Sequence, residues 1–373
     1  MRVKKQVTFL TLESFRATGG IQNVCKNLSY TLNNIATHSG TLSLLNLSMY
    51  DKSAHDSYIK PNRFKGYAGD RLGFLKHAVK HGRKSQTIII GHINLLVVAL
   101  AIKLININTE IIMLAHGTEV WRKIPLWKLV FIRSAVTIWS VSDHTKNILV
   151  ATHHISPDAI TTLHNCLDPL FTAVKEFEKP KDLLQRHHLT SANSILLSVC
   201  RISLHDKEKG YDRTLEMIPK LIAEFPFIHY LMVGYAEPQE KTRLELIIEK
   251  LNIKPHVTFV GLVSEADLSK YYRLCDVFIL PSEKEGFGLV FIEAASHGCT
   301  VISGNQDGSR EALLHGRLGY SVDTSNPENL ETQTANCLQS ERSHNSRLQI
   351  QNLCLAEFSQ EQYETNVLEL LGC

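Results

Sequence analysis

The chain has 373 residues, of which 44% are hydrophobic and 21% are charged, and it carries a net charge of +3. This composition is typical of a soluble globular protein, and so small a charge gives no reason to expect nucleic acid as a partner. The length exceeds one ordinary core and predicts two domains. Because the chain begins with a short basic stretch that leads straight into an expected strand, we expect no signal peptide and a cytoplasmic location.

Eight cysteines occur, with neither a C-x-x-C motif nor the spacing of a zinc site. Most lie in apolar runs, so we expect buried thiols in a reducing compartment.

In chain order, the apolar runs predict an alternation of strands and helices, which is typical of α/β domains with parallel sheets. The strands expected in the first half are 7–12, 86–90, 110–115, 135–140 and 160–164, and the helices are 21–36, 95–104 and one that Ser142 caps. At ten residues, helix 95–104 is too short to cross a bilayer, which takes about 20, so we expect it in the core. The strands expected in the second half are 194–199, 229–234, 257–260, 277–280 and 301–302, and the helices are 211–224, one that begins at 289, and 355–371.

The stretch 277–311 combines a strand, a loop with Glu285, Gly286 and Gly288, a helix and a second strand. Ligands commonly bind at such a loop, because it lies at the carboxyl end of a parallel strand and beside the start of a helix. Glu285 and Glu293 could each bind hydroxyl groups. Alternatively, Glu285 is an acid favoured by the helix dipole and Glu293 a solvated helix residue. The apolar neighbours of Glu293 favour a functional role, because an unpaired charge there would be costly.

Three further patterns have both a structural and a functional interpretation. Gly19-Gly20 before a helix is either a simple turn or part of a phosphate-binding loop. His116, at the end of a strand, is either structural or a binding residue. Arg201 and Lys209 are either exposed basic residues beside a turn or a clamp that stabilises the charge of a diphosphate leaving group.

Two segments are basic. Residues 51–85 carry nine Lys or Arg against three Asp, and residues 121–133 combine four basic residues with two Trp. They are either a solvated surface or a patch that faces anionic lipid or a lipid-diphosphate acceptor.

The stretch PSEKEGFGLVFIEAASHGCTVISGNQDGSREAL, residues 281–313, resembles the C-terminal signature of the retaining glycosyltransferases of family 4. The matching features are the Glu-Gly-Phe-Gly loop, the second Glu and the Gly-x-x-Glu motif that ends at Glu311. Gly19-Gly20, His116-Gly117 and the Arg201/Lys209 pair follow the family's order, so the resemblance covers nearly the whole chain.

The resemblance implies the GT-B fold, with two Rossmann-like domains facing across a cleft and a C-terminal helix crossing back to the first. We expect an acceptor domain at 1–170, a linker at 171–193, a donor domain at 194–345 and a helical segment at 346–373 that packs back towards the first domain. The implied catalytic residues are His116, Arg201, Lys209 and Glu285. The implied donor-binding residues are Gly19, Gly20, Gly234, Leu262, Val263, Phe287, Gly288, Leu289 and Glu293.

The family's activity is transfer of a sugar from a UDP- or GDP-sugar to a hydroxyl with retention at the anomeric carbon, without a metal or another cofactor. The expected partners are the nucleotide-sugar donor, a glycan or polyprenyl-diphosphate-linked acceptor of surface-polysaccharide synthesis, and an anionic membrane face. The chain departs from the family pattern at Cys166 and Cys200, which replace glycines, at Tyr235, and in the insertion 204–208 before Lys209. A non-catalytic sugar-nucleotide-binding scaffold and a GT-B phosphorylase or epimerase stay open as alternatives.

Overall fold

The computed structural model describes residues 4–340 and 342–372. The chain forms two compact units, which are described separately. The first contains Met1–Phe171 and Phe358–Cys373, and the second contains Thr172–Glu357. Residues 346–357 of the segment that was expected to pack back towards the first domain therefore belong to the second unit.

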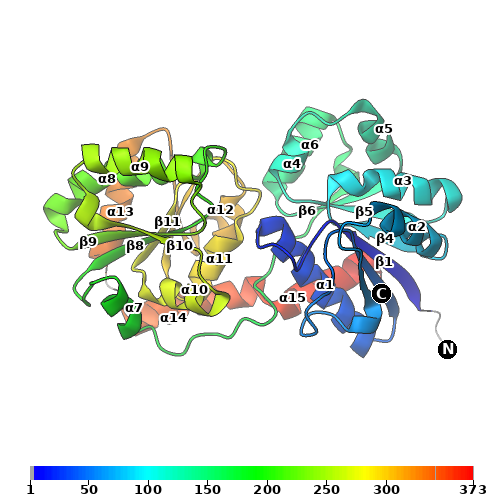
Figure 1. Ribbon diagram of the computed structural model, residues 1–373, viewed down its shortest axis with the longest axis horizontal. Coiled ribbons are helices and arrows are strands. Elements are labelled where there is room, and N and C mark those ends of the chain that lie inside the picture. Colours follow the sequence, from blue (N-terminus) through cyan, green and yellow to red (C-terminus); the bar gives the residue numbers. More distant parts are fainter. Residues whose placement is uncertain (1–3, 341, 373) are drawn as a thin grey trace. The chain divides into compact units, whose positions relative to one another are not determined.

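The first unit is built on a seven-stranded sheet in the order β3-β2-β1-β4-β5-β6-β7, in which every pairing is parallel (Figure 1). Its strands are β1 (Lys5–Thr11), β2 (Leu42–Ser48), β3 (Phe64–Gly66), β4 (Thr87–Ile90), β5 (Glu110–Ala115), β6 (Val136–Ser140) and β7 (Ile160–Thr162). Its helices are α1 (Gly20–His38), α2 (Arg71–Gly82), α3 (Leu96–Ile105), α4 (Thr118–Trp121), α5 (Leu126–Ala135), α6 (Asp143–His153) and α15 (Gln360–Leu371), with 3-10 turns η1 (Pro61–Arg63), η2 (Ile93–Leu95) and η3 (Pro157–Ala159).

The second unit has a six-stranded parallel sheet in the order β10-β9-β8-β11-β12-β13. Its strands are β8 (Ser194–Val199), β9 (Ile228–Val233), β10 (Val257–Gly261), β11 (Val277–Leu280), β12 (Thr300–Gly304) and β13 (Gly319–Val322). Its helices are α7 (Lys181–Arg186), α8 (Tyr211–Glu224), α9 (Pro238–Lys250), α10 (Glu265–Leu274), α11 (Leu289–Ser296), α12 (Ser309–Ala312), α13 (Pro327–Gln339) and α14 (His344–Phe358), with 3-10 turns η4 (Lys207–Lys209), η5 (Lys254–His256) and η6 (Leu314–Gly316).

The two parallel α/β sheets confirm the predicted fold class. Strands such as β4 and β11 are buried along their whole length, which is why they read as unbroken apolar runs. Ser142 caps α6 as predicted, because its Oγ accepts a hydrogen bond from the backbone N–H of Thr145 at 3.1 Å. In the part of the chain that the structure describes, no helix is long and apolar enough to cross a membrane.

Some elements differ from the prediction. Strands β2, β3 and β13 were not predicted. Buried and half-buried residues alternate along β2, and β3 and β13 are short, so none of them has an unbroken buried run along its whole length. The expected last helix, 355–371, is two helices, because the chain leaves the helical conformation at Ser359, which caps α15. Helix α15 then packs beside α1 within the first unit (Figure 1).

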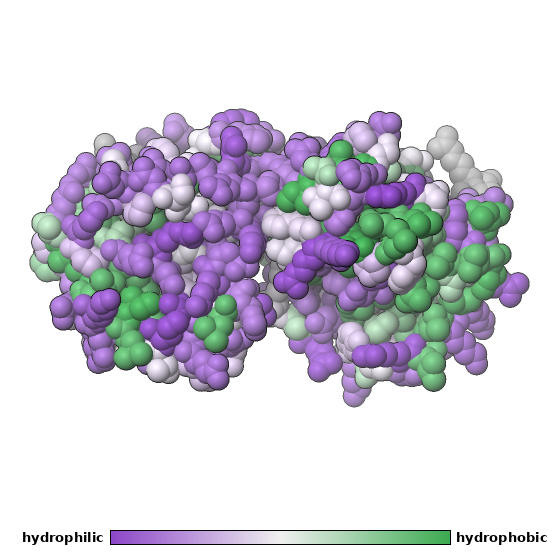
Figure 2. Space-filling view, turned by 90° about the horizontal axis from the view of Figure 1, so that it is seen from above, coloured by the Kyte–Doolittle hydropathy of each residue, from purple (hydrophilic) through white to green (hydrophobic). Residues whose placement is uncertain are grey.

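Helix α3 is only partly a core helix, which corrects the prediction for 95–104. Its inner side chains, such as Val98 and Ile102, are buried, but Val97, Leu104 and Ile105 are 56%, 78% and 52% exposed. Figure 2 shows hydrophobic residues gathered on this face of the first unit. An amphipathic helix of this length normally turns polar residues to solvent, so the outer side of α3 departs from the usual pattern.

The segment after β7 is held to α1 by a small polar network. Asp168 accepts hydrogen bonds from the hydroxyl of Tyr58 at 2.9 Å and forms an ion pair with Lys26 at 3.0 Å. The amide of Asn27 donates to the Cys166 carbonyl oxygen at 3.2 Å. The Asn-Cys-Leu-Asp stretch is therefore anchored before the chain leaves the first unit.

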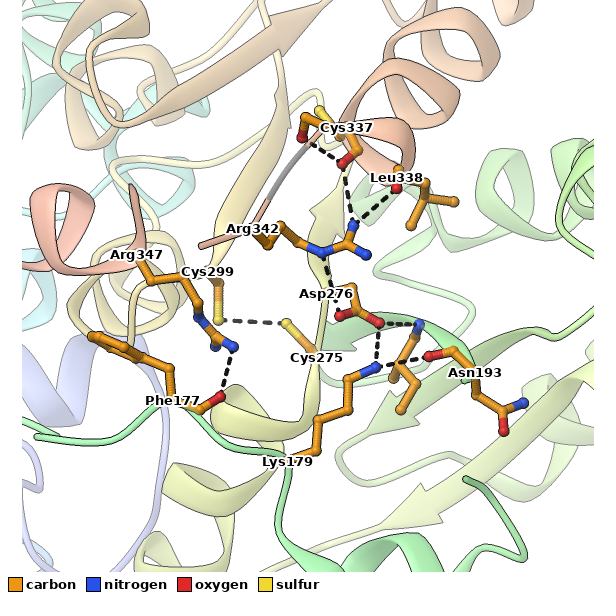
Figure 3. A network of polar contacts seen from close by, with 12 residues as sticks. Phe177, Lys179, Asn193, Cys275, Asp276, Cys299, Cys337, Leu338, Arg342 and Arg347 are labelled. Atoms are coloured by element: carbon orange, nitrogen blue, oxygen red, sulfur yellow. Dashed lines mark hydrogen bonds and ion pairs between the residues drawn. The ribbon is translucent and has the colours of Figure 1, made fainter. Parts of the chain in front are cut away.

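A buried carboxylate ties the start of the second unit together (Figure 3). Asp276, which is 6% exposed, accepts hydrogen bonds from Lys179 Nζ at 2.7 Å and from the backbone N–H of Ile195 at 2.8 Å. Arg342 lies 3.5 Å away on its other oxygen. Because these residues come from the linker, from β8 and from the segment before α14, the single carboxylate joins elements far apart in sequence.

Replacing Asp276 by Ala is expected to lower the free energy of unfolding by about 3 to 5 kcal/mol, because it removes the buried carboxylate that pairs with Lys179 and Arg342 and accepts the backbone N–H of Ile195. Urea unfolding followed by circular dichroism measures the change. Asp182→Ala is the matched control, since the Asp182–Lys270 ion pair lies at the surface and its loss should leave stability nearly unchanged. Equal midpoints for the two variants would contradict the role given to Asp276.

Candidate active site

The loop between β11 and α11 brings two of the predicted catalytic residues together. Glu285 lies on this loop, and Lys209 ends the η4 turn before α8. Their side chains form an ion pair and are 14% and 22% exposed. Burial lowers the pKa of Lys209, but the Glu285 carboxylate more than offsets this and leaves the pKa raised. The structure thus holds one ammonium group, permanently charged at neutral pH, beside one carboxylate.

Asp307 fixes the conformation of this loop. One of its oxygens accepts hydrogen bonds from the backbone N–H of Glu285 at 2.7 Å and from Ser282 Oγ at 3.0 Å. Its other oxygen accepts from the N–H and the hydroxyl of Ser309 at 3.0 and 2.5 Å. The backbones also meet closely, since a Cβ on Gly308 would lie 2.1 Å from the Gly286 carbonyl oxygen. The loop is therefore rigid before any ligand arrives.

Arg201 and Lys209 do not share a partner, although the sequence suggested a joint clamp. Arg201 forms a two-pronged contact with Asp206, at 2.7 and 3.1 Å, and its side chain is 62% exposed. Asp206 belongs to the insertion 204–208. The insertion therefore supplies a carboxylate that pairs with Arg201, while Lys209 pairs with Glu285.

Glu293 lies within helix α11. Its carboxylate accepts a hydrogen bond from the hydroxyl of Tyr272 at 2.8 Å. Burial, together with the Glu293 charge, raises the pKa of Tyr272, so this hydroxyl stays protonated and keeps donating. The tyrosine holds the carboxylate in one orientation while Glu293 remains half-buried.

The other predicted residues in and beside this loop are Phe287, Gly288 and Leu289, and each has a different structural environment. The ring of Phe287 is 2% exposed, and a contact of this residue with the donor stays a prediction. Gly288 has a φ of +86°, and a Cβ there would strike the Phe291 ring, so both conformation and space require glycine. Leu289 is the first residue of α11.

A surface pocket of about 340 Å³ lies at the carboxyl ends of β9 and β10. Leu262 and Tyr235 line it, together with Ala236, Lys241, Phe259, Val260 and Gly261. Gly234 has a φ of +134°, and a Cβ there would lie 2.0 Å from the Cys200 carbonyl oxygen. Val263, which was predicted beside Leu262, is not among the lining residues.

In the first unit, a buried carboxylate also shapes the loop that precedes Gly19 and Gly20. Asp51, 1% exposed, accepts hydrogen bonds from the backbone N–H groups of Ser14, Phe15 and Arg16 at 2.7, 3.0 and 2.7 Å. Gly19 has an extended backbone (φ 179°), and a Cβ on Gly20 would meet nothing within 4 Å. The space beside Gly20 is therefore open, whereas the Gln22 side chain lies over Gly19, with its Oε1 2.5 Å from where a Cβ would be.

His116 follows β5, and its ring is held by the first unit itself. Nε2 lies 2.9 Å from the Gly91 carbonyl oxygen, so the Nε2–H donates there and Nδ1 is left as an acceptor. Nδ1 is buried and has no hydrogen-bond partner within residues 4–340 and 342–372. The contact of His116 with a donor sugar stays a prediction.

Sequence reasoning missed three residues that organise these sites: Asp51, Tyr272 and Asp307. Asp307 lies within residues 281–313, directly before the glycine of the Gly-x-x-Glu motif. The sequence therefore placed it in the matching stretch but did not show its hydrogen bonds. Asp51 and Tyr272 had no local signal, because their partners lie 35 to 37 and 21 residues away.

Within the described ranges, no group of three or more His, Cys, Asp or Glu side chains could hold a metal ion.

The second unit matches a known family. Residues 182–352 match the family described as glycosyl transferases group 1. A GDP-mannose-dependent alpha-(1-6)-phosphatidylinositol monomannoside mannosyltransferase of Mycobacterium tuberculosis is 28% identical over 225 residues, which are 56% of this chain and 55% of that protein. The match to this relative thus spans about half its length. The resemblance to glycosyltransferases is confirmed by these matches, while membership of family 4 stays a prediction.

Two solved structures share the fold over nearly the whole chain. A glycosyltransferase from Rickettsia africae has a TM-score of 0.78 at 16% identity and covers 99% of this chain and 98% of its own. Anabaena Alr3699/HepE in complex with UDP has a TM-score of 0.78 at 17% identity, with 98% and 99% covered. The two parallel α/β units are therefore those of a GT-B glycosyltransferase fold.

The free energy of unfolding should depend on pH through the protonation of Asp307. Burial raises its pKa to about 6, above the usual 3.8. Between these values the folded protein binds a proton that the unfolded chain has released, so the free energy of unfolding falls as pH rises from about 4 to about 6. Asp307→Asn should remove this part of the slope. Urea unfolding across this range tests it against Asp56→Asn, an exposed control, and identical slopes for Asp307→Asn and wild type would refute it.

Proposed function

We propose that this protein is a retaining glycosyltransferase that moves a sugar from a UDP- or GDP-sugar to a hydroxyl group. The observation that carries the proposal is the Lys209–Glu285 ion pair on a loop that Asp307 holds rigid, at the carboxyl end of β11 and beside the start of α11. The match to group 1 glycosyl transferases supports it, as do relatives named for GDP-mannose and for a UDP complex.

In the proposed reaction, the bond between the anomeric carbon and the donor's diphosphate breaks, and the acceptor oxygen bonds to the same face of that carbon. The acceptor's proton passes to the departing phosphate oxygen. The ammonium of Lys209 opposes the negative charge that develops on the leaving group, with Arg201 as a second cation. Glu285 accepts hydrogen bonds from sugar hydroxyls, and Glu293 accepts them from the ribose.

The described residues suit a donor-binding role without a metal ion, since positive side chains and the start of α11 oppose the diphosphate charge. We propose a lipid-linked or glycan acceptor of surface-polysaccharide synthesis, and contact with an anionic membrane face inside the cell. The relative that acts on phosphatidylinositol monomannoside supports a lipid-linked acceptor.

The first test measures nucleotide binding. Calorimetry with UDP and GDP should show binding of one of them by the wild type and a loss of about tenfold or more for Glu293→Gln, since a hydrogen bond to a charged group contributes about 1.5 to 3 kcal/mol. Tyr272→Phe should weaken binding less, because it only frees the carboxylate. Glu249→Gln, on an exposed part of α9, is the control. Wild-type affinity in Glu293→Gln would rule out the ribose contact.

The second test measures turnover with the nucleotide sugar identified in this way. Lys209→Ala should lower turnover by about 10²-fold or more, the usual effect of removing one preorganised charge partner of a transition state. Lys207→Ala, an exposed lysine two residues earlier, should leave turnover unchanged. Activity should survive EDTA, and a strict requirement for Mg²⁺ or Mn²⁺ would contradict the metal-free mechanism.

A further inference from the structure

Arg201 is an exposed side chain that has one fixed partner. It lies two residues after β8, and its side chain is 62% exposed. In the part of the chain that the structure describes, Asp206 is the one residue that accepts hydrogen bonds from Arg201, at 2.7 Å from Nε and 3.1 Å from Nη2. An exposed arginine without such a partner samples many rotamers, and a ligand that orders it loses affinity through the lost side-chain entropy.

The contact uses one edge of the guanidinium and leaves another available. A guanidinium has five N–H groups in one plane: Nε and one Nη form its side edge, and the two Nη atoms form its end edge. Asp206 binds the side edge, through Nε and Nη2. Nη1 has no hydrogen-bond partner within residues 4–340 and 342–372. The end edge therefore keeps two parallel N–H groups, the arrangement that binds two phosphate oxygens at once.

Asp206 is held in place by the turn that contains it. Its backbone N–H donates to the Ser203 carbonyl oxygen at 3.0 Å, and its own carbonyl oxygen accepts from the Lys209 N–H at 2.9 Å. Ser203 is 1% exposed, and its hydroxyl donates to the Asp206 carboxylate. The carbonyl oxygen of Ser203 also accepts the Tyr211 hydroxyl at 2.9 Å. These bonds fix both the backbone and the carboxylate of Asp206.

The carboxylate lies inward and the guanidinium lies outward. The Asp206 side chain is 16% exposed, against 62% for Arg201. Burial raises the pKa of Asp206, but hydrogen bonds from Arg201 and Ser203 more than offset this and leave the pKa lowered, so the group is charged at neutral pH. An anion that arrives from solvent therefore meets the guanidinium before it meets a carboxylate whose charge is already shared among three hydrogen bonds.

Arg201 lies at the same edge of the sheet as the Lys209–Glu285 ion pair. Strands β8 and β11 pair in parallel, so the residues that follow them emerge at one edge. Burial raises the pKa of the Cys200 thiol to about 12, and the charges of Lys209, Glu285 and Asp206 also act on this thiol. The site thus has two cations, each with a carboxylate of its own, and the carboxylates offset the repulsion between the cations.

We propose that Asp206 is a positioning residue, which holds the Arg201 guanidinium so that its end edge binds the diphosphate of the donor. This role rests on the proposed function and goes beyond it, because it assigns a task to the insertion 204–208. A carboxylate that competed with the diphosphate would occupy the edge that the phosphates need and would be free to move away. Asp206 instead binds the side edge and is anchored to buried Ser203.

The experiment compares the full-chain wild type with Asp206→Asn and Asp206→Glu. Calorimetry uses UDP or GDP, whichever the wild type binds, and turnover is measured with the corresponding nucleotide sugar. Asp206→Asn keeps the shape but loses the charge and turns one acceptor into a donor that faces Arg201. It should weaken diphosphate binding about tenfold and lower kcat/KM by about tenfold or more, the effect of losing a charged hydrogen bond. Asp206→Glu should recover part of both, since it restores a carboxylate.

A double-variant cycle separates positioning from a merely structural role. Arg201→Ala should lower turnover at least as much as Asp206→Asn, and the combined variant should be no less active than Arg201→Ala alone, because Asp206 acts through the guanidinium. Arg201→Lys should behave like Asp206→Asn, since an ammonium cannot use two edges at once. Additive losses in the combined variant would overturn the proposal.

Glu208→Gln is the matched control. Glu208 is an acid of the same insertion, and it lies 3.9 Å from Lys284 in a weak surface ion pair, so its variant should match the wild type in binding and turnover. Urea midpoints show whether each variant is folded. If Asp206→Asn does not fold, Arg201→Lys measures the same contact from its exposed partner, and wild-type turnover in that variant refutes the positioning role.

The remaining outcomes are also decisive. Wild-type turnover in Asp206→Asn refutes the positioning role, and tighter diphosphate binding with faster turnover identifies Asp206 as a competitor for Arg201. A wild type that binds neither UDP nor GDP and transfers no sugar refutes the proposed activity and the role of Asp206 with it. An active wild type that is impaired by Arg201→Ala but not by Asp206→Asn refutes the role of Asp206 alone.

Discussion

The candidate active site depends on a buried carboxylate that is not proposed to contact the substrate. Asp307 uses both oxygens to hold Ser282, Glu285 and Ser309, so the end of β11 and the start of α12 fix the same loop from two sides. Without that anchor, Glu285 would sit on a glycine-softened loop with many conformations. Because the loop is held in advance, the ion pair with Lys209 forms without a further loss of backbone conformational entropy in the loop.

The same device recurs across the protein. Asp51 holds three successive backbone N–H groups of the loop before α1, and Asp276 joins the linker to β8. In each case a carboxylate that is nearly inaccessible to solvent accepts hydrogen bonds from backbone N–H groups, and Asp276 also pairs with the Lys179 ammonium. Parallel sheets place functional loops at one edge, but those loops lack regular hydrogen bonds of their own. Buried acids supply the missing acceptors.

The first unit has two surfaces of opposite polarity, one at the loop before α1 and one on the outer side of α3 and α5. The loop before α1 is polar and is held by Asp51, whereas α3 and α5 expose apolar side chains such as Val97, Leu104 and Leu126.

How much the sequence alone could determine follows from the range of the interactions. Long apolar runs such as 110–115 and 277–280 predicted strands correctly, because burial on both faces leaves a local pattern. The loop of Glu285 was also recognisable, since its glycines and acids are contiguous. Tertiary structure alone decided that Lys209 pairs with Glu285 while Arg201 pairs with Asp206, and that α3 exposes its apolar side. Those outcomes depend on which elements become neighbours in space, and neither residue spacing nor hydropathy contains that information.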